Sequence, residues 1–254
     1  MRNWSGGSMI ATAAAAVAVF SLMPIPAAGQ APAGAFPRAR DGRPDFSGIW
    51  QVMNTANFDI QDHPAQKGVP AGQGVVEGNE IPYLPAALAK KMDNYKNRAT
   101  ADPESKCYLP GVPRSTYLPF PFQILQTPDQ VTILHEYAHA IRYIYTNGTP
   151  HPRGPIEWWM GDSRGRWDGD TLVVDTVHFN ADTWFDRAGN HHSDALHVVE
   201  RFSFIDRDHL RYEVGIEDPK VFTRPWKMNM VIYRHTEPAF QLLEYECYSF
   251  LPQE

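Results

Sequence analysis

The chain has 254 residues, a formal net charge of −6 and 22 prolines. Its acidic balance, without a basic stripe, argues against nucleic acid as a partner. The proline content exceeds the usual ~5% and favours short elements and shaped loops over long helices.

Residues 1–28 have the features of a signal peptide. Arg2 precedes an apolar, alanine-rich run over residues 9–23, and small residues suited to cleavage follow near Ala27. The alternative, a membrane anchor, is disfavoured because a span needs roughly 20 apolar residues. The sequence therefore predicts a periplasmic or secreted protein with no membrane attachment after cleavage.

The rest of the chain is predicted to form one domain, because its length suits a single well-filled β core. Residues 29–43 are rich in Ala, Pro and Gly and are interpreted as a flexible tract, so the β-barrel domain covers residues 44–254. It opens with Pro44-Asp-Phe-Ser-Gly-Ile-Trp50. An aromatic residue followed by Gly-x-Trp on a first strand is similar to the opening motif of lipocalin-type barrels, in which the Trp closes one end.

One sizeable helix is expected, over residues 82–97. Apolar side chains fall there at helical spacing, and such a stripe is typical of packing against a core. The stripe consists of Leu84, Leu88, Met92 and Tyr95. The segments on either side, residues 53–81 and 98–119, carry scattered Gly and Pro and are interpreted as long loops.

From residue 122 onwards the sequence is typical of β-strands separated by turns. Asp168-Gly169 is a strong signal for a tight hairpin. The predicted strands cover residues 122–127, 130–137, 139–146, 163–168, 171–177, 196–205, 210–217, 226–235 and 240–249. Many short strands with regular turns indicate a mainly β fold, a single antiparallel, lipocalin-like β-barrel of about eight to ten strands with one helix and long Pro-rich loops.

Four motifs together resemble one family. They are Pro44-Asp-Phe-Ser-Gly-Ile-Trp50, Lys106-Cys-Tyr-Leu-Pro-Gly-Val-Pro-Arg114, Trp159-Met-Gly-Asp-Ser-Arg-Gly-Arg-Trp-Asp-Gly-Asp-Thr-Leu-Val-Val-Asp-Thr176 and His192-Ser-Asp-Ala-Leu-His-Val-Val-Glu-Arg-Phe202. Over most of its mature length the chain resembles a widespread family of exported bacterial proteins with a lipocalin-like β-barrel. The resemblance implies export and the barrel, and it carries no activity with it. The family's Asp-Gly-Arg turn is Asn147-Gly148-Thr149 here, so no arginine role transfers to that turn.

The two cysteines are Cys107 and Cys247. In an exported protein they are expected to form one disulfide that links an early loop to the last strand. Such a bridge would stabilise the fold by roughly 3–5 kcal/mol through its effect on the unfolded chain. Two buried free thiols are the alternative.

His135-Glu136-Tyr137-Ala138-His139 matches the H-E-x-x-H signature of zinc hydrolases. The signature works only on a helix, because on a strand the two histidines would lie about 13 Å apart, too far to share one metal. The neighbouring Val, Ile and Thr favour a strand. We therefore expect a strand with His135, Tyr137 and His139 on one face, and zinc is the less expected alternative.

Residues 178–194 form a loop dense in His, Asp, Asn and Trp, and a connection that long is commonly functional. His192 and Asp186 are the candidate acid–base pair, because a histidine near its ordinary pKa can exchange protons beside a carboxylate at neutral pH. Trp184 would hold a flat ligand. Because loops lie at the surface, His192→Ala is expected to change stability by no more than about 0.5 kcal/mol.

Other interpretations stay open for parts of this set. The adjacent His191 and His192, together with His197, could bind a metal, although adjacent residues rarely both reach one ion. Glu213, Glu217 and Asp218 could pair with arginines such as Arg201, Arg211 or Arg224, and buried ion pairs of this kind are often structural. The candidate catalytic residues are His192, Asp186, His139, Arg142 and Glu200, and the candidate ligand-binding residues are Trp184, Asn180, Tyr137, His191, His197 and Trp159.

These residues predict an exported enzyme of lyase, isomerase or hydrolase type. It would use His/carboxylate acid–base chemistry, without an organic cofactor, on a small apolar or aromatic molecule in a barrel pocket. The absence of a glycine-rich dinucleotide fingerprint argues against a nicotinamide enzyme. A non-catalytic carrier that uses the same pocket is the alternative, and a zinc hydrolase is the least expected one.

Overall fold

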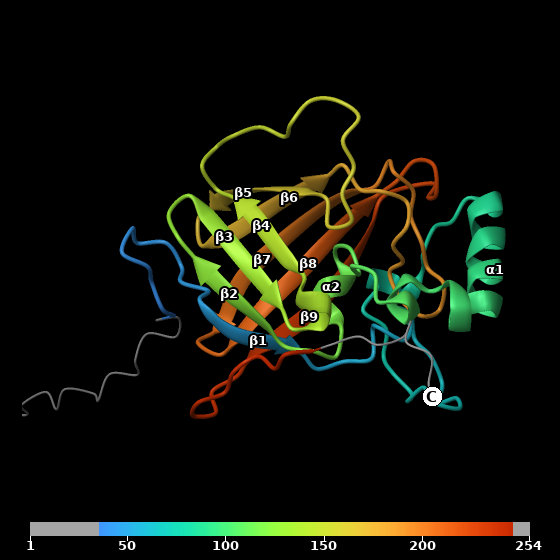
Figure 1. Ribbon diagram of the computed structural model, residues 1–254, viewed down its shortest axis with the longest axis horizontal. Helices are drawn as coiled ribbons and strands as arrows, with labels where there is room; N and C mark the ends of the chain where they lie inside the picture. Colours follow the sequence, from blue (N-terminus) through green and yellow to red (C-terminus); the bar gives the residue numbers. More distant parts are fainter. Residues whose placement is uncertain (1–35, 246–254) are drawn as a thin grey trace, which may run out of the picture. The chain divides into compact units, whose positions relative to one another are not determined.

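The computed structural model describes residues 36–245, which fold into a closed barrel of nine β-strands (Figure 1). Neighbours in sequence order are hydrogen-bonded, and the last strand closes the barrel against the first. The predicted mainly β barrel is therefore confirmed, whereas the predicted signal peptide lies outside the described residues. The strands are β1 (Gly48–Val52), β2 (Phe122–Gln126), β3 (Gln130–His135), β4 (Ile141–Tyr145), β5 (Asp162–Asp168), β6 (Thr171–Val177), β7 (His197–Asp206), β8 (His209–Glu217) and β9 (Trp226–Arg234).

One strand pair departs from the predicted antiparallel order. β4 and β5 are parallel, with Ile144 opposite Ser163, whereas every other neighbouring pair is antiparallel. The segment 146–161, the long loop above β4 and β5 in Figure 1, carries the chain back before β5 begins. Parallel neighbours require such a crossover. The barrel is therefore mixed rather than purely antiparallel.

The strand predicted at residues 240–249 is not formed in its described part. Residues 235–245 contain no strand. β9 pairs with β1 instead, with Trp50 opposite Arg234, so the edge that a further strand would cover is already hydrogen-bonded. Cys247 lies outside the described residues, and the Cys107–Cys247 disulfide stays a prediction.

Trp50 of β1 lies in an aromatic cluster with Phe46 and Phe204. The Trp50 ring is fully buried, and its Nε1 donates to the carbonyl oxygen of Phe46 at 2.8 Å. The Arg234 guanidinium lies 4.0 Å from the Trp50 ring centroid. Gly48 has φ +142°, and a Cβ there would lie 2.3 Å from Arg234 Nη1. This contact explains the Gly-x-Trp pattern and agrees with the expected lipocalin-like opening.

Inward side chains fill the barrel. Alternate residues of β7 and β8 are buried, which places Val198, Phe202, Leu210 and Val214 in the hydrophobic core. The interior is a packed core, so the pockets described below lie outside it, among the connections.

Helix α1 (Pro85–Ala101) lies beyond one end of the barrel (Figure 1). It begins later than predicted because Leu84 has an extended backbone and Pro85 occupies the first turn. The predicted apolar stripe reaches the core in part: Leu84 packs against it, whereas Leu88 and Met92 are 44% and 58% exposed. The short helices are η1 (Glu77–Asn79), η2 (Pro103–Lys106), α2 (Arg114–Tyr117) and η3 (Tyr137–His139).

No helix among residues 36–245 combines the length and the apolar character needed to cross a membrane.

Candidate functional site

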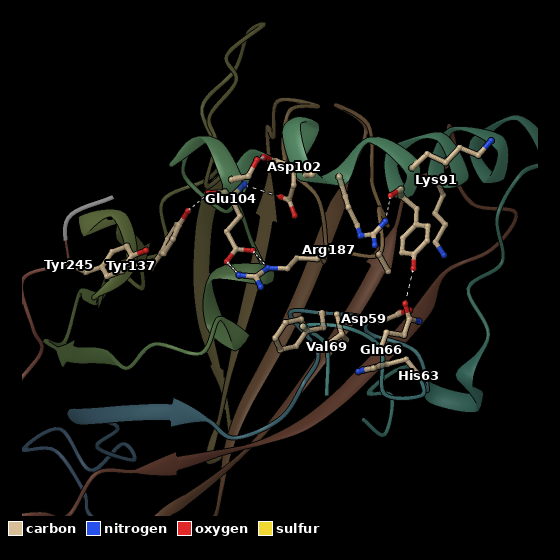
Figure 2. Close-up of a pocket in the computed structure, with 18 residues that line it drawn as sticks. Asp59, His63, Gln66, Val69, Lys91, Asp102, Glu104, Tyr137, Arg187 and Tyr245 are labelled. Carbon is tan, nitrogen blue, oxygen red and sulfur yellow. Dashed lines mark hydrogen bonds and ion pairs between the residues drawn. The ribbon is translucent and has the colours of Figure 1, made fainter. Parts of the chain in front are cut away.

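A pocket of about 610 Å³ lies at the α1 end of the barrel (Figure 2). Figure 2 shows Lys91, Asp59 and His63 toward one side of it and Tyr137 and Tyr245 toward the other. The remaining lining residues are Phe58, Gln66, Gly68, Val69, Tyr95, Lys96, Arg98, Ala99, Asp102, Glu104, Ser105, Arg187 and Ala188.

Segments distant in sequence assemble this pocket. Tyr95 Oη of α1 donates to Gln66 Oε1 at 3.2 Å, which ties the helix to the loop before it. Asn94 Nδ2 donates to the carbonyl oxygen of Gly189 at 3.2 Å, which ties the helix to the loop between β6 and β7. Gly189 has φ +84°, and a Cβ there would lie 2.7 Å from Tyr95 N. Glycine is therefore required for this close approach.

A buried ion-pair network beside the pocket centres on Arg114 of α2. Its guanidinium donates to both oxygens of Asp102, at 2.8 and 3.0 Å, and to Glu104 Oε2 at 2.5 Å, while Nε donates to Asn57 Oδ1 at 3.0 Å. Arg187 supplies a second cation and donates to Glu104 at 2.9 and 2.6 Å. Burial opposes ionisation of Glu104, but the hydrogen bonds from Arg187 and the charge of Arg114 outweigh it and lower the pKa of Glu104. Both acids of the network are thus paired with arginines, and such buried ion pairs are typically structural.

Asp59 is a carboxyl group of the pocket wall with different surroundings. It is half-buried, and Oδ1 accepts the backbone N–H of Gln61 at 3.0 Å. Within the described part of the chain it forms no ion pair closer than 4 Å. Burial raises the pKa of Asp59, against smaller opposing effects from the Gln61 amide, Lys91 and His63. Asp59 therefore exchanges its proton at a higher pH than a solvated carboxyl group.

Asp186 is a second carboxyl group next to Asp59. It is fully buried; Oδ2 accepts Ile60 N at 2.9 Å and Asn190 Nδ2 at 2.6 Å, and Oδ1 accepts Asn190 N at 3.1 Å. Burial, followed by the negative charge of Asp59, raises the pKa of Asp186 to about 7. The two carboxyl groups therefore titrate as a pair that keeps one proton up to near neutral pH.

His63 lies in the same wall as Asp59. Its Nδ1 is 2.8 Å from the carbonyl oxygen of Gln61, so Nδ1 carries a proton and donates it. In the neutral ring Nε2 is then an acceptor, and no residue in the described range donates to it although the ring is only 8% exposed. The pocket thus contains a histidine and a carboxyl group, the combination that the sequence predicted in a different loop.

His192, the predicted catalytic histidine, is buried and has both ring nitrogens occupied. It is 1% exposed; Nδ1 donates to the carbonyl oxygen of Ser193 at 2.9 Å, and Nε2 accepts from Thr183 Oγ1 at 2.6 Å. Burial lowers the pKa of His192, which favours this neutral form. Asp186 has other partners, so the structure does not bring the predicted His192–Asp186 pair together.

His192→Ala is expected to destabilise the protein by about 1–3 kcal/mol, because the buried Thr183 Oγ1 and the half-buried Ser193 carbonyl oxygen lose their partner. Urea denaturation measures the loss. His197→Ala is the matched control, since its bond to Asp175 Oδ1 at 3.2 Å is partly exposed and should contribute less than about 1 kcal/mol. Wild-type stability of the His192→Ala protein would contradict a structural role.

Three other predicted ligand-binding residues lie at or near a separate hollow. Trp184 and Trp159 line it, and the Trp159 and Tyr108 rings meet at 5.1 Å between centroids. Asn180 lies beside it, where Asn180 Oδ1 accepts the backbone N–H of Asp182 at 3.2 Å. The segment 101–106 contributes some of its residues to this hollow and others to the pocket.

His191 and His197, two predicted ligand-binding residues, do not line the pocket. His191 stacks on Tyr83, with 5.9 Å between ring centroids, and burial lowers its pKa to about 4, helped by the charge of Lys90. His197 on β7 bonds to Asp175, and that hydrogen bond raises the pKa of His197. These rings therefore do not form the alternative three-histidine site.

Arg142 and Glu200 meet in the barrel interior, where both are at most 2% exposed. Arg142 Nη1 donates to Glu200 Oε1 at 2.9 Å, and Nη2 donates to Glu200 Oε2. Hydroxyl groups complete the cluster: Arg142 also donates to Ser163 Oγ at 3.0 Å and to Thr176 Oγ1 at 2.9 Å, and Tyr212 Oη donates to Glu200 at 2.6 Å. The structure joins these two predicted residues, but neither lines the pocket.

The H-E-x-x-H segment forms neither the helix that zinc requires nor the predicted strand. β3 ends at His135, and a turn follows in which Ala138 and His139 have φ of 55° and 48°. The turn breaks the expected alternation, so His135 is buried whereas His139 is exposed. Tyr137 does reach the pocket, and its Oη donates to the carbonyl oxygen of Glu104 at 3.0 Å. Across residues 36–245, no group of three or more His, Cys, Asp or Glu side chains could hold a metal ion.

Sequence reasoning missed the pocket residues Asp59, His63 and the polar face of α1. Lys91, Tyr95 and Arg98 recur at positions i, i+4 and i+7, and this helical spacing was the signal available. Asp59 gives no local signal, because its partner carboxyl group lies far along the chain.

The resemblance to an exported bacterial family stays a prediction, and the functional argument rests on the pocket's own chemistry. No family model matches this chain, and no curated protein matches it closely enough to count as a relative.

Proposed function

We propose that the pocket is an active site in which Asp59 exchanges a proton with a small apolar or aromatic molecule. The observation that carries the proposal is the position of Asp59: it faces the pocket without an ion-pair partner among the described residues, next to the buried carboxyl group of Asp186. General acid–base catalysis needs a group that is ionised and protonated in turn near the working pH. Such proton transfer occurs in lyases, isomerases and hydrolases and needs no organic cofactor.

An isomerisation illustrates how the proposed step balances. Ionised Asp59 accepts a proton from a C–H bond of the substrate, and the electron pair of that bond moves into the substrate. Protonated Asp59 then returns the proton to another carbon, which regenerates the carboxylate. Asp186 is a positioning residue, because it does not line the pocket and is coupled to Asp59 through the charge of Asp59, which raises the pKa of Asp186.

The lining suits a substrate with an apolar or aromatic part. Phe58, Val69, Tyr95 and Ala188 contribute apolar surface to the wall that also holds Asp59. We further propose that the protein works in the periplasm or medium after loss of residues 1–28, with Cys107 and Cys247 bridged. The support for this location is the apolar, alanine-rich N-terminus.

A screen of small aromatic and terpenoid-like compounds tests the proposal. Each compound is incubated with the purified protein, and turnover is followed by NMR while binding is followed by thermal shift. Turnover that depends on Asp59 supports the enzyme. Binding of a compound without turnover of any would favour the carrier, which would use the same pocket for transport.

The shared proton predicts how kcat/KM varies with pH. Because the pKa of Asp186 is about 7, the carboxyl pair holds one proton below that pH and loses it above. If the singly protonated pair is the active form, kcat/KM falls about tenfold per pH unit above about pH 7. A pH–rate profile measures this decrease. A constant kcat/KM from about pH 6 to about pH 9 would show that the reaction does not depend on the protonation of the carboxyl pair.

A further inference from the structure

The rim of the pocket carries three cations from helix α1. Lys91, Lys96 and Arg98 all come from α1 and line the pocket. None of the three forms an ion pair with another described residue. The acids Asp102 and Glu104 do not compensate them, because two arginines of the buried network already bind both carboxylates.

Arg98 is held in position for a ligand. Its guanidinium lies 4.0 Å from the Tyr95 ring centroid, and Nη1 donates to the carbonyl oxygen of Tyr95 at 2.7 Å. A guanidinium has five N–H donors in a planar fork, so most of the donors of Arg98 stay available. Lys91 is half-buried, and its charge acts on the Asp59 carboxyl group. The cations therefore extend from the pocket rim to the proposed reacting group.

We propose that the molecule bound in this pocket carries an anionic oxygen group, a carboxylate or a phosphate, which Lys91, Lys96 and Arg98 bind. This inference rests on the proposed function and names the substrate class of the same site. The chain as a whole has a formal charge of −6, whereas these three cations, which have no ion-pair partner among the described residues, gather around one pocket and favour an anion there. Arginine and lysine are the donors that carboxylates and phosphates bind most strongly in proteins.

Binding of such an anion should be coupled to proton uptake. A negative charge placed near Lys91 also lies near Asp59, and it disfavours ionisation of the Asp59–Asp186 pair as any like charge does. The complex at pH 7 should therefore hold more protons than the free protein. Calorimetry in two cationic buffers with different enthalpies of ionisation measures this uptake, which should disappear in the Asp59→Asn protein if Asp59 supplies the coupling.

Matched probes test the anion preference. Benzoate, phenyl phosphate and benzamide share one ring, and only the first two carry a charge. At pH 7 and low salt, at least one anion should bind the purified protein about tenfold or more tightly than benzamide, and its affinity should fall as salt rises. The comparison of benzoate with phenyl phosphate then distinguishes a carboxylate site from a phosphate site.

Single-charge variants locate the binding. Lys91→Gln and Arg98→Gln should each weaken binding of the preferred anion by about fivefold or more. Lys90→Gln is the matched control, because Lys90 is exposed on the same helix and does not line the pocket. Equal affinity for benzamide and both anions, no binding of either anion, or unchanged affinity in the Lys91 and Arg98 variants would overturn the inference.

The two proposals fail in different ways. Anion binding depends on the α1 cations and should survive Asp59→Asn, whereas turnover should not. Preferential anion binding together with Asp59-independent turnover would refute only the catalytic role of Asp59. Asp59-dependent turnover of a neutral substrate, with no preference for anions, would refute only the anion site.

Discussion

Asp59→Asn is expected to lower kcat/KM by about 10²- to 10⁴-fold, the range that a positioned acid–base group contributes. An amide cannot accept and return a proton in this pH range. The fold should be preserved, because Asn keeps an Oδ1 that can accept the Gln61 backbone N–H, as Asp59 does at 3.0 Å. A steady-state assay with the substrate found in the screen gives the kinetic change, and thermal denaturation gives the stability.

Asp62→Asn is the matched control for this variant. Asp62 lies on the same loop, is exposed, and accepts the backbone N–H of Gly74 at 2.6 Å, but it does not line the pocket. Its substitution should leave turnover close to that of the wild type. Removing the Asp59 charge should also lower the pKa of Asp186, which a ¹³C NMR titration of the carboxyl groups can follow. Unchanged turnover in a correctly folded Asp59→Asn protein would exclude Asp59 as the acid–base group.

The barrel is predictable because its signals are local. Each strand of the β7–β8 pair alternates buried and exposed residues along its own length, and Asp168-Gly169 closes the β5–β6 hairpin in sequence. The parallel β4–β5 pair is not predictable in the same way. Asn147-Gly148 is a hairpin signal, yet which strand returns beside β4 depends on where the long segment 146–161 ends.

Spacing and residue type misled the prediction where tertiary contacts decide the outcome. Leu88 and Met92 have the spacing of a packing stripe, but α1 stands beside the barrel's connections and leaves both side chains exposed. His135 and His139 have the spacing of a zinc motif, but the left-handed backbone of Ala138 and His139 turns the chain after β3. In both cases the residue spacing is present in the sequence, but the tertiary contacts of the segment differ from those that usually accompany this spacing.

The misplaced acid–base pair has the same origin. A loop rich in His and Asp looks like a catalytic loop, but His192 and Asp186 use their polar atoms to hold the loop's own conformation, and Asp186 also accepts Ile60 N from another segment. Buried polar groups need hydrogen-bond partners. A buried loop with many polar residues can therefore owe them to its own folding as well as to catalysis. Asp59, which faces the pocket, stands in a stretch with no motif at all.

Breaking the ion pair in the barrel interior is expected to have the largest effect on stability. Arg142→Leu should lower the free energy of unfolding by about 3–5 kcal/mol, because it leaves the Glu200 carboxylate buried without its cation. Tyr212 Oη would still donate to Glu200, at 2.6 Å in the wild type, but one neutral donor does not replace a bidentate guanidinium. Urea denaturation at neutral pH measures the loss.

The double variant Arg142→Leu/Glu200→Leu shows whether the loss comes from an unpaired charge or from the missing arginine itself. With both charges removed, Ser163 and Thr176 still hydrogen-bond each other, at 3.1 Å in the wild type, so the double variant should regain most of the stability that Arg142→Leu loses. Arg38→Leu is the surface control: Arg38 pairs with Asp170 in solvent, and its loss should leave the denaturation midpoint nearly unchanged. A double variant less stable than Arg142→Leu would contradict this expectation. It would mean that the contacts of the pair stabilise the barrel by more than the cost of burying its two charges, and that they hold β4 to β7 across the interior.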